Sequence, residues 1–195
     1  MALEDYSYFF IVCEGTNEEW AFNYIQESGR LNIHHYNTDF IRAHTRNAKR
    51  ELLQHITELS YDGRVAILHI RDRQDEKWDI TATMKKIISA RGIDIIPVVT
   101  FPEIEYLLII SNDEAARGWR KVKSKDKQVN PSGFCKSFFG CNIKNGESFI
   151  RLFNGFGAFY SACKQYKQKY CKQEALCLVD LITEIDQERP PLSVI

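Results

Sequence analysis

The first hundred residues alternate between short apolar runs and segments with helical spacing. Four runs have the length and composition of strands: Tyr8–Cys13, 33–44, Arg64–Ile70 and Ile93–Val99. Helical periodicity covers Glu18–Glu27, Arg46–Leu59 and Ile80–Ala90, and a shorter helix, Glu103–Ile110, follows Pro102. Strands that alternate with helices usually pair in parallel. The sequence therefore predicts an α/β fold with a mostly parallel four-stranded sheet flanked by helices.

The character of the chain changes after residue 111. Lys121–Lys127 carries four lysines, and Asn130–Gly146 contains Gly, Pro and Asn. Two helices are predicted further on, at about 157–172 and about 174–187. We therefore expect an α/β core over 1–112, with a basic loop and helical extension over 113–195 packed on it.

Composition excludes several classes of protein. The 195 residues are 44% apolar, which is enough for a packed core, and their formal net charge of zero argues against a general nucleic-acid coat. The absence of a long apolar run and of a secretion signal predicts a cytoplasmic protein without a membrane partner. None of the six cysteines forms a C-x-x-C pair, so we expect scattered reduced thiols. Hydrolase-elbow, P-loop and dinucleotide-binding motifs are also missing from the sequence.

Acidic residues follow the predicted strands. Glu14 and Glu18 come after the first strand, Asp72 and Asp75 after the third, and Glu105 after the fourth. Open α/β sheets place their chemistry at the carboxyl edge, and clustered carboxylates suit Mg²⁺. For any one of these residues alone, a solvent-exposed position without a function is the simpler explanation. We adopt that explanation for Asp39, near the end of the second strand.

Three motifs, taken in order, resemble the Toprim domain. They are Glu14-Gly-x-x-Glu18, Asp72-x-x-Asp75 and Phe101-Pro102-Glu103-Ile104-Glu105-Tyr106-Leu107-Leu108, and they cover residues 8 to about 110. The closest similarity is to the RloB-like group, which is related to the nuclease half of overcoming-lysogenization-defect (OLD) proteins. The family motif Asp-x-Asp is Asp72-Arg73-Gln74 in this chain, and Asp75 follows one place later.

The resemblance implies a Toprim-like core and a nuclease that cleaves phosphodiesters, with a role in defence against foreign nucleic acid. It implies Mg²⁺ or Mn²⁺ held by Glu14, Asp72 and Asp75, with help from Glu18 and Glu105. Glu14 and Asp72 would be the catalytic residues, with Glu14 as base or metal-positioning group. Because Gln74 brings no charge, an alternative is a non-catalytic Toprim-fold partner of an ATPase or of nucleic acid. A primase-type activity is weaker, since the additional domains of such enzymes are not evident.

Basic residues suggest where nucleic acid would lie. Lys121, Lys123, Lys125 and Lys127 alternate, so on an extended segment they would line one face and meet phosphates. Trp119 and Phe134 could stack on a base there. Arg71 and Arg73 flank the acidic cluster and would counter phosphate charge or pair with carboxylates. A solvated loop remains the alternative for the lysines, and His69 is expected to pack inside the third strand.

Overall fold

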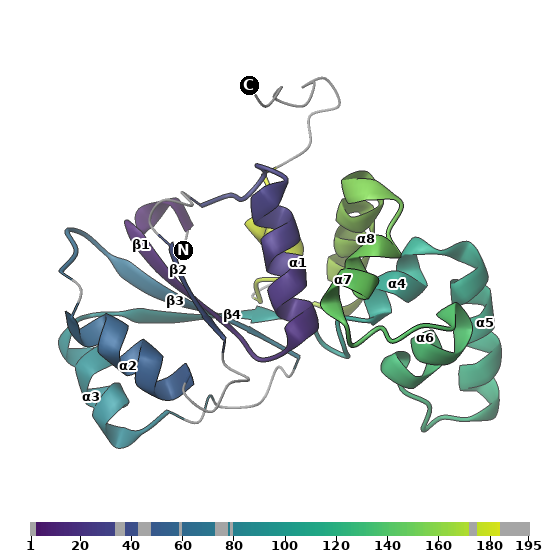
Figure 1. The fold of residues 1–195 in the computed structure, drawn as a ribbon, viewed down its shortest axis with the longest axis horizontal. Helices are drawn as coiled ribbons and strands as arrows, with labels where there is room; N and C mark the ends of the chain where they lie inside the picture. Colours follow the sequence, from purple (N-terminus) through teal and green to yellow (C-terminus); the bar gives the residue numbers. More distant parts are fainter. Residues whose placement is uncertain are drawn as a thin grey trace.

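A computed structural model describes residues 3–33, 38–42, 48–58, 60–72, 78, 80–171 and 175–183. Its sheet has four parallel strands in the order β2-β1-β3-β4 (Figure 1). The strands are β1 (Tyr8–Cys13), β2 (Thr38–Arg42), β3 (Val65–Arg71) and β4 (Asp94–Val99). The predicted apolar runs at Tyr8–Cys13 and Arg64–Ile70 form the two inner strands, β1 and β3, and these strands are buried on both faces. The predicted α/β class is confirmed.

Helices cover both faces of the sheet, because neighbouring side chains of a strand point to opposite faces. In β1, Phe9 and Ile11 face the cluster that includes α1 (Thr16–Glu27). Phe10 and Val12 face the cluster formed with α2 (Ala48–Glu58) and α3 (Ala82–Ala90). Figure 1 shows α1 on one side of the strands and the α2–α3 pair on the other.

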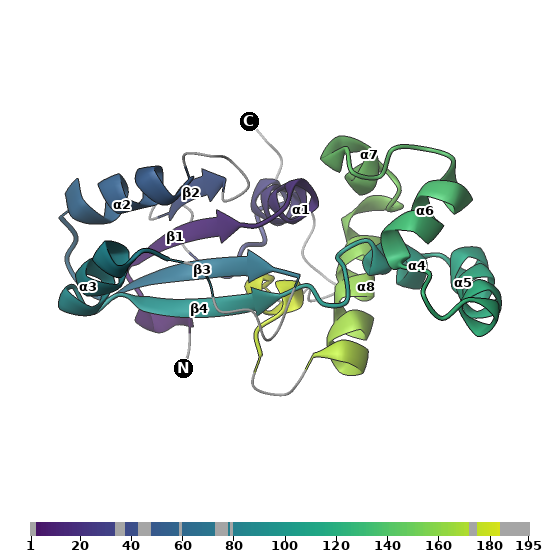
Figure 2. The ribbon, with the colours of Figure 1, turned by 90° about the horizontal axis from the view of Figure 1, so that it is seen from below.

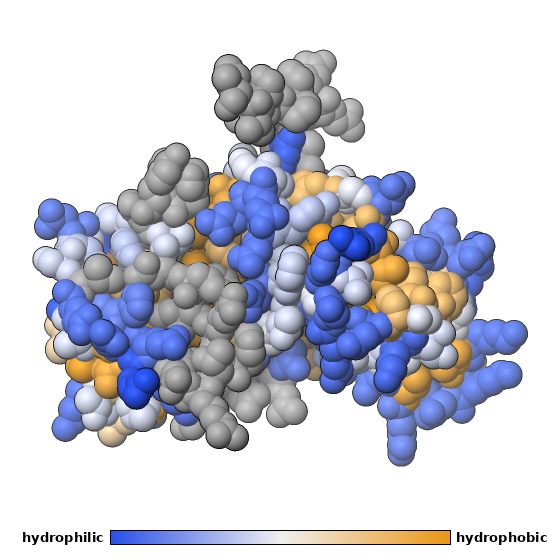
Figure 3. Space-filling model, in the orientation of Figure 1, coloured by the Kyte–Doolittle hydropathy of each residue, from blue (hydrophilic) through white to orange (hydrophobic). Residues whose placement is uncertain are grey.

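The remaining helices form a second half that faces the carboxyl ends of the strands. These helices are α4 (Tyr106–Ser111), α5 (Asp113–Lys125), α6 (Pro131–Phe139), α7 (Gly146–Arg151) and α8 (Gly155–Tyr170). Figure 2 shows the arrowheads of β1, β3 and β4 pointing toward this half. Buried residues of α4 and α8 belong to the same hydrophobic cluster as the α1 face of the sheet. On the surface drawn in Figure 3, hydrophobic patches of this half are surrounded by hydrophilic side chains.

A glycine allows α1 and α7 to approach closely. A Cβ added to Gly146, the first residue of α7, would lie 1.7 Å from Cδ1 of Trp20 on α1. The indole therefore lies directly against the α7 backbone. This contact holds the helix that follows β1 against the helical half.

The end of the described chain returns to the sheet. Leu176 forms a parallel bridge with Val98 of β4, and Ile182 forms an antiparallel bridge with Leu31, after α1. Between them lies a 3₁₀ helix, η3 (Leu178–Leu181), whose Asp180 pairs with Lys167 of α8. Another 3₁₀ helix, η1 (Leu3–Asp5), precedes β1. None of the described helices is long and apolar enough to cross a membrane.

Three predictions about the second half are wrong. The lysine-bearing segment is helical through Lys125 rather than extended, because Asn112 caps α5 by accepting the Ala115 N–H. Residues 175–183 form η3 and isolated bridges instead of the predicted helix. Cys171 and Cys177 form a disulfide, so they are not free thiols.

Candidate carboxylate cleft

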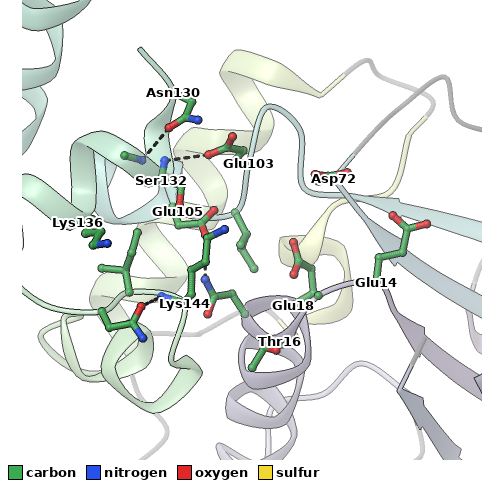
Figure 4. A pocket seen from close by; sticks show the side chains of 16 residues that line it. Glu14, Thr16, Glu18, Asp72, Glu103, Glu105, Asn130, Ser132, Lys136 and Lys144 are labelled. Carbon is green, nitrogen blue, oxygen red and sulfur yellow. Dashed lines mark hydrogen bonds between the residues drawn. The ribbon is translucent and has the colours of Figure 1, made fainter. Parts of the chain in front are cut away.

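A cleft of about 890 Å³ lies where the carboxyl ends of the strands meet the helical half. One wall carries carboxylates that follow β1, β3 and β4, and the other consists of α6 and the loop between α6 and α7. Figure 4 shows Glu14, Glu18 and Asp72 on one side of the cleft and Lys136 and Lys144 toward the other. Four of the predicted carboxylates, Glu14, Glu18, Asp72 and Glu105, thus line one cleft.

Glu14 begins the acidic wall directly after β1. Its carboxylate is half-buried, and Oε1 lies 2.9 Å from Nε2 of His69 without the alignment of a hydrogen bond. His69 is buried, as predicted, and its ring stacks on Trp78 at 4.6 Å between centroids. The buried imidazole therefore borders one side of the Glu14 carboxylate, and the cleft borders the other.

Glu18 is buried in the first turn of α1, where its carboxylate accepts a hydrogen bond from its own backbone N–H. Its Oε1 also accepts the hydroxyl of Thr100 at 3.3 Å. Burial, followed by the charges of Glu105 and Asp72, raises the pKa of Glu18 to about 7, although both hydrogen bonds lower it. A helix N-terminus stabilises a negative charge and so lowers the pKa of a carboxyl there. Burial acts in the opposite direction and outweighs this effect for Glu18.

Glu105 precedes α4 and is tied to α1. The Nδ2 of buried Asn17 donates to Glu105 Oε1 at 3.0 Å, which joins the end of β4 to the helix after β1. Burial is the main cause that raises the pKa of Glu105, while the charge of Lys144 lowers it. The carboxylate is therefore positioned from the acidic wall and influenced by the opposite one.

Glu103 was not singled out as a site residue, and it closes one end of the cleft. Its Oε2 accepts the backbone N–H of Ser132 at 2.8 Å, in the first turn of α6. Asn130 caps the same helix by accepting the Gly133 N–H. A carboxylate at a helix N-terminus is stabilised by the helix dipole, so Glu103 joins the segment after β4 to α6.

Asp72 follows β3 directly, is half-buried and lines the cleft. Its charge contributes to the raised pKa of Glu18, so the two carboxylates influence each other. The predicted ligand Asp75, the flanking Arg73 and the variant position Gln74 lie outside the described residues. Arg71 ends β3 without lining the cleft.

The cations of the cleft differ from the predicted ones. Lys136 on α6 and Lys144 before α7 line it, whereas Lys121, Lys123, Lys125 and Lys127 do not. Trp119 and Phe134 are buried and pack edge-to-face at 5.4 Å between centroids, so neither offers a ring to a base in this structure. No local motif marks Lys136 or Lys144, because packing of the helical half brings them to the cleft.

The cleft offers the oxygen donors that Mg²⁺ and Mn²⁺ prefer. Mutual repulsion among Glu18, Asp72 and Glu105 helps raise the pKa of Glu18, and a divalent cation would relieve that repulsion. Within the described residues, no three His, Cys, Asp or Glu side chains gather closely enough to hold an ion. The donor types therefore fit these metals, although a complete ligand set is not assembled in the described part.

No family model, curated protein or solved structure matches the chain.

Proposed function

We propose that this chain is a Toprim-like, metal-dependent nuclease that cleaves phosphodiester bonds. The observation that carries the proposal is that Glu14, Glu18, Asp72 and Glu105 line one cleft opposite two lysines. Carboxylates on one wall suit a divalent cation, and lysines on the other suit the phosphates of a substrate. The defence role rests on the motif resemblance alone.

The roles of the residues follow from their positions. Glu14 lines the cleft and lies beside His69, so it is the group that accepts a proton from the attacking water. Lys136 and Lys144 hold the substrate phosphate from the opposite wall. Glu14 and Asp72 would hold Mg²⁺ or Mn²⁺, with Glu18 and Glu105 beside them and Asp75 as a further ligand. The bound cation would supply positive charge for the phosphate and the leaving oxygen.

Cleavage of plasmid DNA and of RNA by the purified protein tests the proposal. We expect cleavage with Mn²⁺ or Mg²⁺, its loss in EDTA, and a loss of about 100-fold or more in Glu14→Gln, as for other groups that transfer protons. Glu27→Gln is the matched control, because Glu27 is exposed at the other end of α1. Absence of cleavage with every divalent ion, together with no affinity for Mn²⁺, would overturn the proposal in favour of a non-catalytic partner of an ATPase or of nucleic acid.

A further inference from the structure

A second hollow, of about 590 Å³, lies between α4, α5 and the end of α8. We call it the basic groove, and six of its lining residues define it: Tyr106, Arg120, Lys123, Pro131, Lys169 and Tyr170. In the described part of the chain no Asp or Glu lines it. It is therefore a positively charged site, distinct from the carboxylate cleft.

The three cations of the basic groove are available to an anion. Arg120 and Lys169 are exposed, and none of the three forms an ion pair with a carboxylate among the described residues. Lys123 is held in place, since its ammonium donates to the carbonyls of Lys127 at 2.6 Å and Val129 at 2.9 Å. An ammonium has three N–H groups, so one remains for a ligand.

Aromatic rings form the floor between these cations. Lys169 Nζ lies 5.1 Å from the ring centroid of Tyr170 and 5.8 Å from that of Tyr106. Lys123 Nζ lies 5.5 Å from the ring of Trp119. Tyr170 is half-buried, so part of its ring borders the groove. Tyr106 and Trp119 are buried, so Tyr170 is the ring that a base can reach, and cations beside such a ring suit the phosphates of an unpaired strand.

The basic groove adjoins the carboxylate cleft. Glu103 and Ser132, which are hydrogen-bonded to each other, line the cleft, and their chain neighbours Pro102 and Pro131 line the groove. On each segment the two sites meet at consecutive residues, whose Cα atoms are about 3.8 Å apart. A single strand can therefore occupy both.

We propose that the basic groove binds the backbone of a single-stranded nucleic acid whose next nucleotides enter the carboxylate cleft. The inference rests on the proposed nuclease function, because it names the substrate class of that cleft. It also refines the lysine prediction: Lys123 contacts the strand together with Arg120 and Lys169, whereas Lys121, Lys125 and Lys127 face elsewhere. A single strand is favoured over a duplex because an unpaired base can reach the part of the Tyr170 ring that borders the groove.

Fluorescence anisotropy with a labelled oligothymidylate of about 12 nucleotides, in EDTA to prevent cleavage, tests the groove. We expect Arg120→Gln/Lys169→Gln to weaken binding about 10-fold or more and to reduce the slope of log K against log salt by about 1.4, the value for two lost phosphate contacts. Arg120→Lys/Lys169→Arg should restore most of the affinity. The control Lys121→Gln/Lys125→Gln changes charge equally on exposed residues of α5 and should stay within about twofold.

The outcomes separate this inference from the nuclease proposal. A wild-type protein that binds the oligonucleotide through the groove but cleaves nothing with any divalent ion would support the groove proposal and overturn the nuclease proposal. If the groove variant and the control variant lose affinity for the oligonucleotide equally, the groove proposal is overturned, even if the protein cleaves nucleic acid. Displacement of the oligonucleotide by polyglutamate at equal charge concentration would also overturn it, because the groove would then suit an acidic protein segment.

Discussion

The carboxylate of Glu18 occupies the space in which any residue other than glycine at position 15 would place its Cβ. That Cβ would lie 2.2 Å from Glu18 Oε2. Gly15 has an extended backbone, with φ of −131° and ψ of 162°, which other residues adopt readily. Position 15 therefore needs glycine because of the space that the Glu18 carboxylate occupies, and not because of the backbone conformation. This explains why a glycine stands between the two glutamates of the Glu-Gly-x-x-Glu motif.

Gly15→Ala should displace the Glu18 carboxylate without unfolding the protein. The clash falls on the end of a flexible side chain, so we expect the free energy of unfolding to change by about 1 kcal/mol or less. The pKa of Glu18 should fall from about 7 toward its ordinary value, because the carboxylate moves toward solvent. A carboxyl NMR titration of glutamate-labelled protein measures this change, and an unchanged Glu18 pKa would contradict the prediction.

Glu18→Gln should remove a pH dependence of stability. The pKa of Glu18 is raised in the folded protein, so its proton is bound more tightly there than in the unfolded chain. The wild type should therefore lose stability as pH rises from about 4.5 to about 7, by roughly 2 to 4 kcal/mol in all. Urea unfolding at pH 5 and pH 8 measures the loss, which should be much smaller in Glu18→Gln. Glu27→Gln should behave like the wild type, and an equal loss in both variants would contradict the assignment to Glu18.

Lys136→Gln and Lys144→Gln should each weaken substrate binding in the carboxylate cleft. We expect KM for a nucleic-acid substrate to rise about 3- to 10-fold at low salt, with a smaller effect at high salt, because a phosphate contact is lost. Steady-state cleavage at two salt concentrations measures this. Lys164→Gln is the control, since Lys164 is exposed on α8 and does not line the cleft. An unchanged KM in both cleft variants would show that neither lysine contacts the substrate.

Gly146→Ala should weaken the contact between α1 and α7. The added Cβ would overlap the ring of Trp20, which is 39% exposed and can move only in part. We expect a loss of about 1 to 3 kcal/mol in the free energy of unfolding, the usual cost of overpacking. Urea denaturation measures it. Adding Trp20→Ala should recover part of the loss, and strictly additive losses would show that the two residues do not interact.

The first half of the fold could be predicted because its pattern is local. Each inner strand is an apolar run, and α3 is capped by Thr81, which accepts the Met84 N–H. In the second half, α6 was missed although its signals are present: Asn130 as cap, Pro131 in the first turn, and Gly140 at the end with φ of 66°. Those residues were interpreted as loop composition. The alternating lysines were likewise misinterpreted, because a period of two has meaning only on a strand.

The acidic wall could be predicted and the basic wall could not. Parallel strands bring their carboxyl ends to one edge, so Glu14, Asp72 and Glu105 were expected to lie near one another. Lys136 and Lys144 reach the cleft through the packing of α6 and α7, which depends on contacts such as that between Gly146 and Trp20. The spacing of residues along the sequence does not predict such packing between helices.

The return of residues 175–183 to the sheet has a consequence for biosynthesis. Glu14 and Glu18 leave the ribosome well before Leu176 and Ile182, which can bind beside Val98 and Leu31 only once they have been made. During translation, the edge of β4 and the loop after α1 lack these partners, and Lys136 and Lys144 arrive late as well. The growing chain therefore displays Glu14 and Glu18 long before the opposite wall of the cleft, with Lys136 and Lys144, has been made.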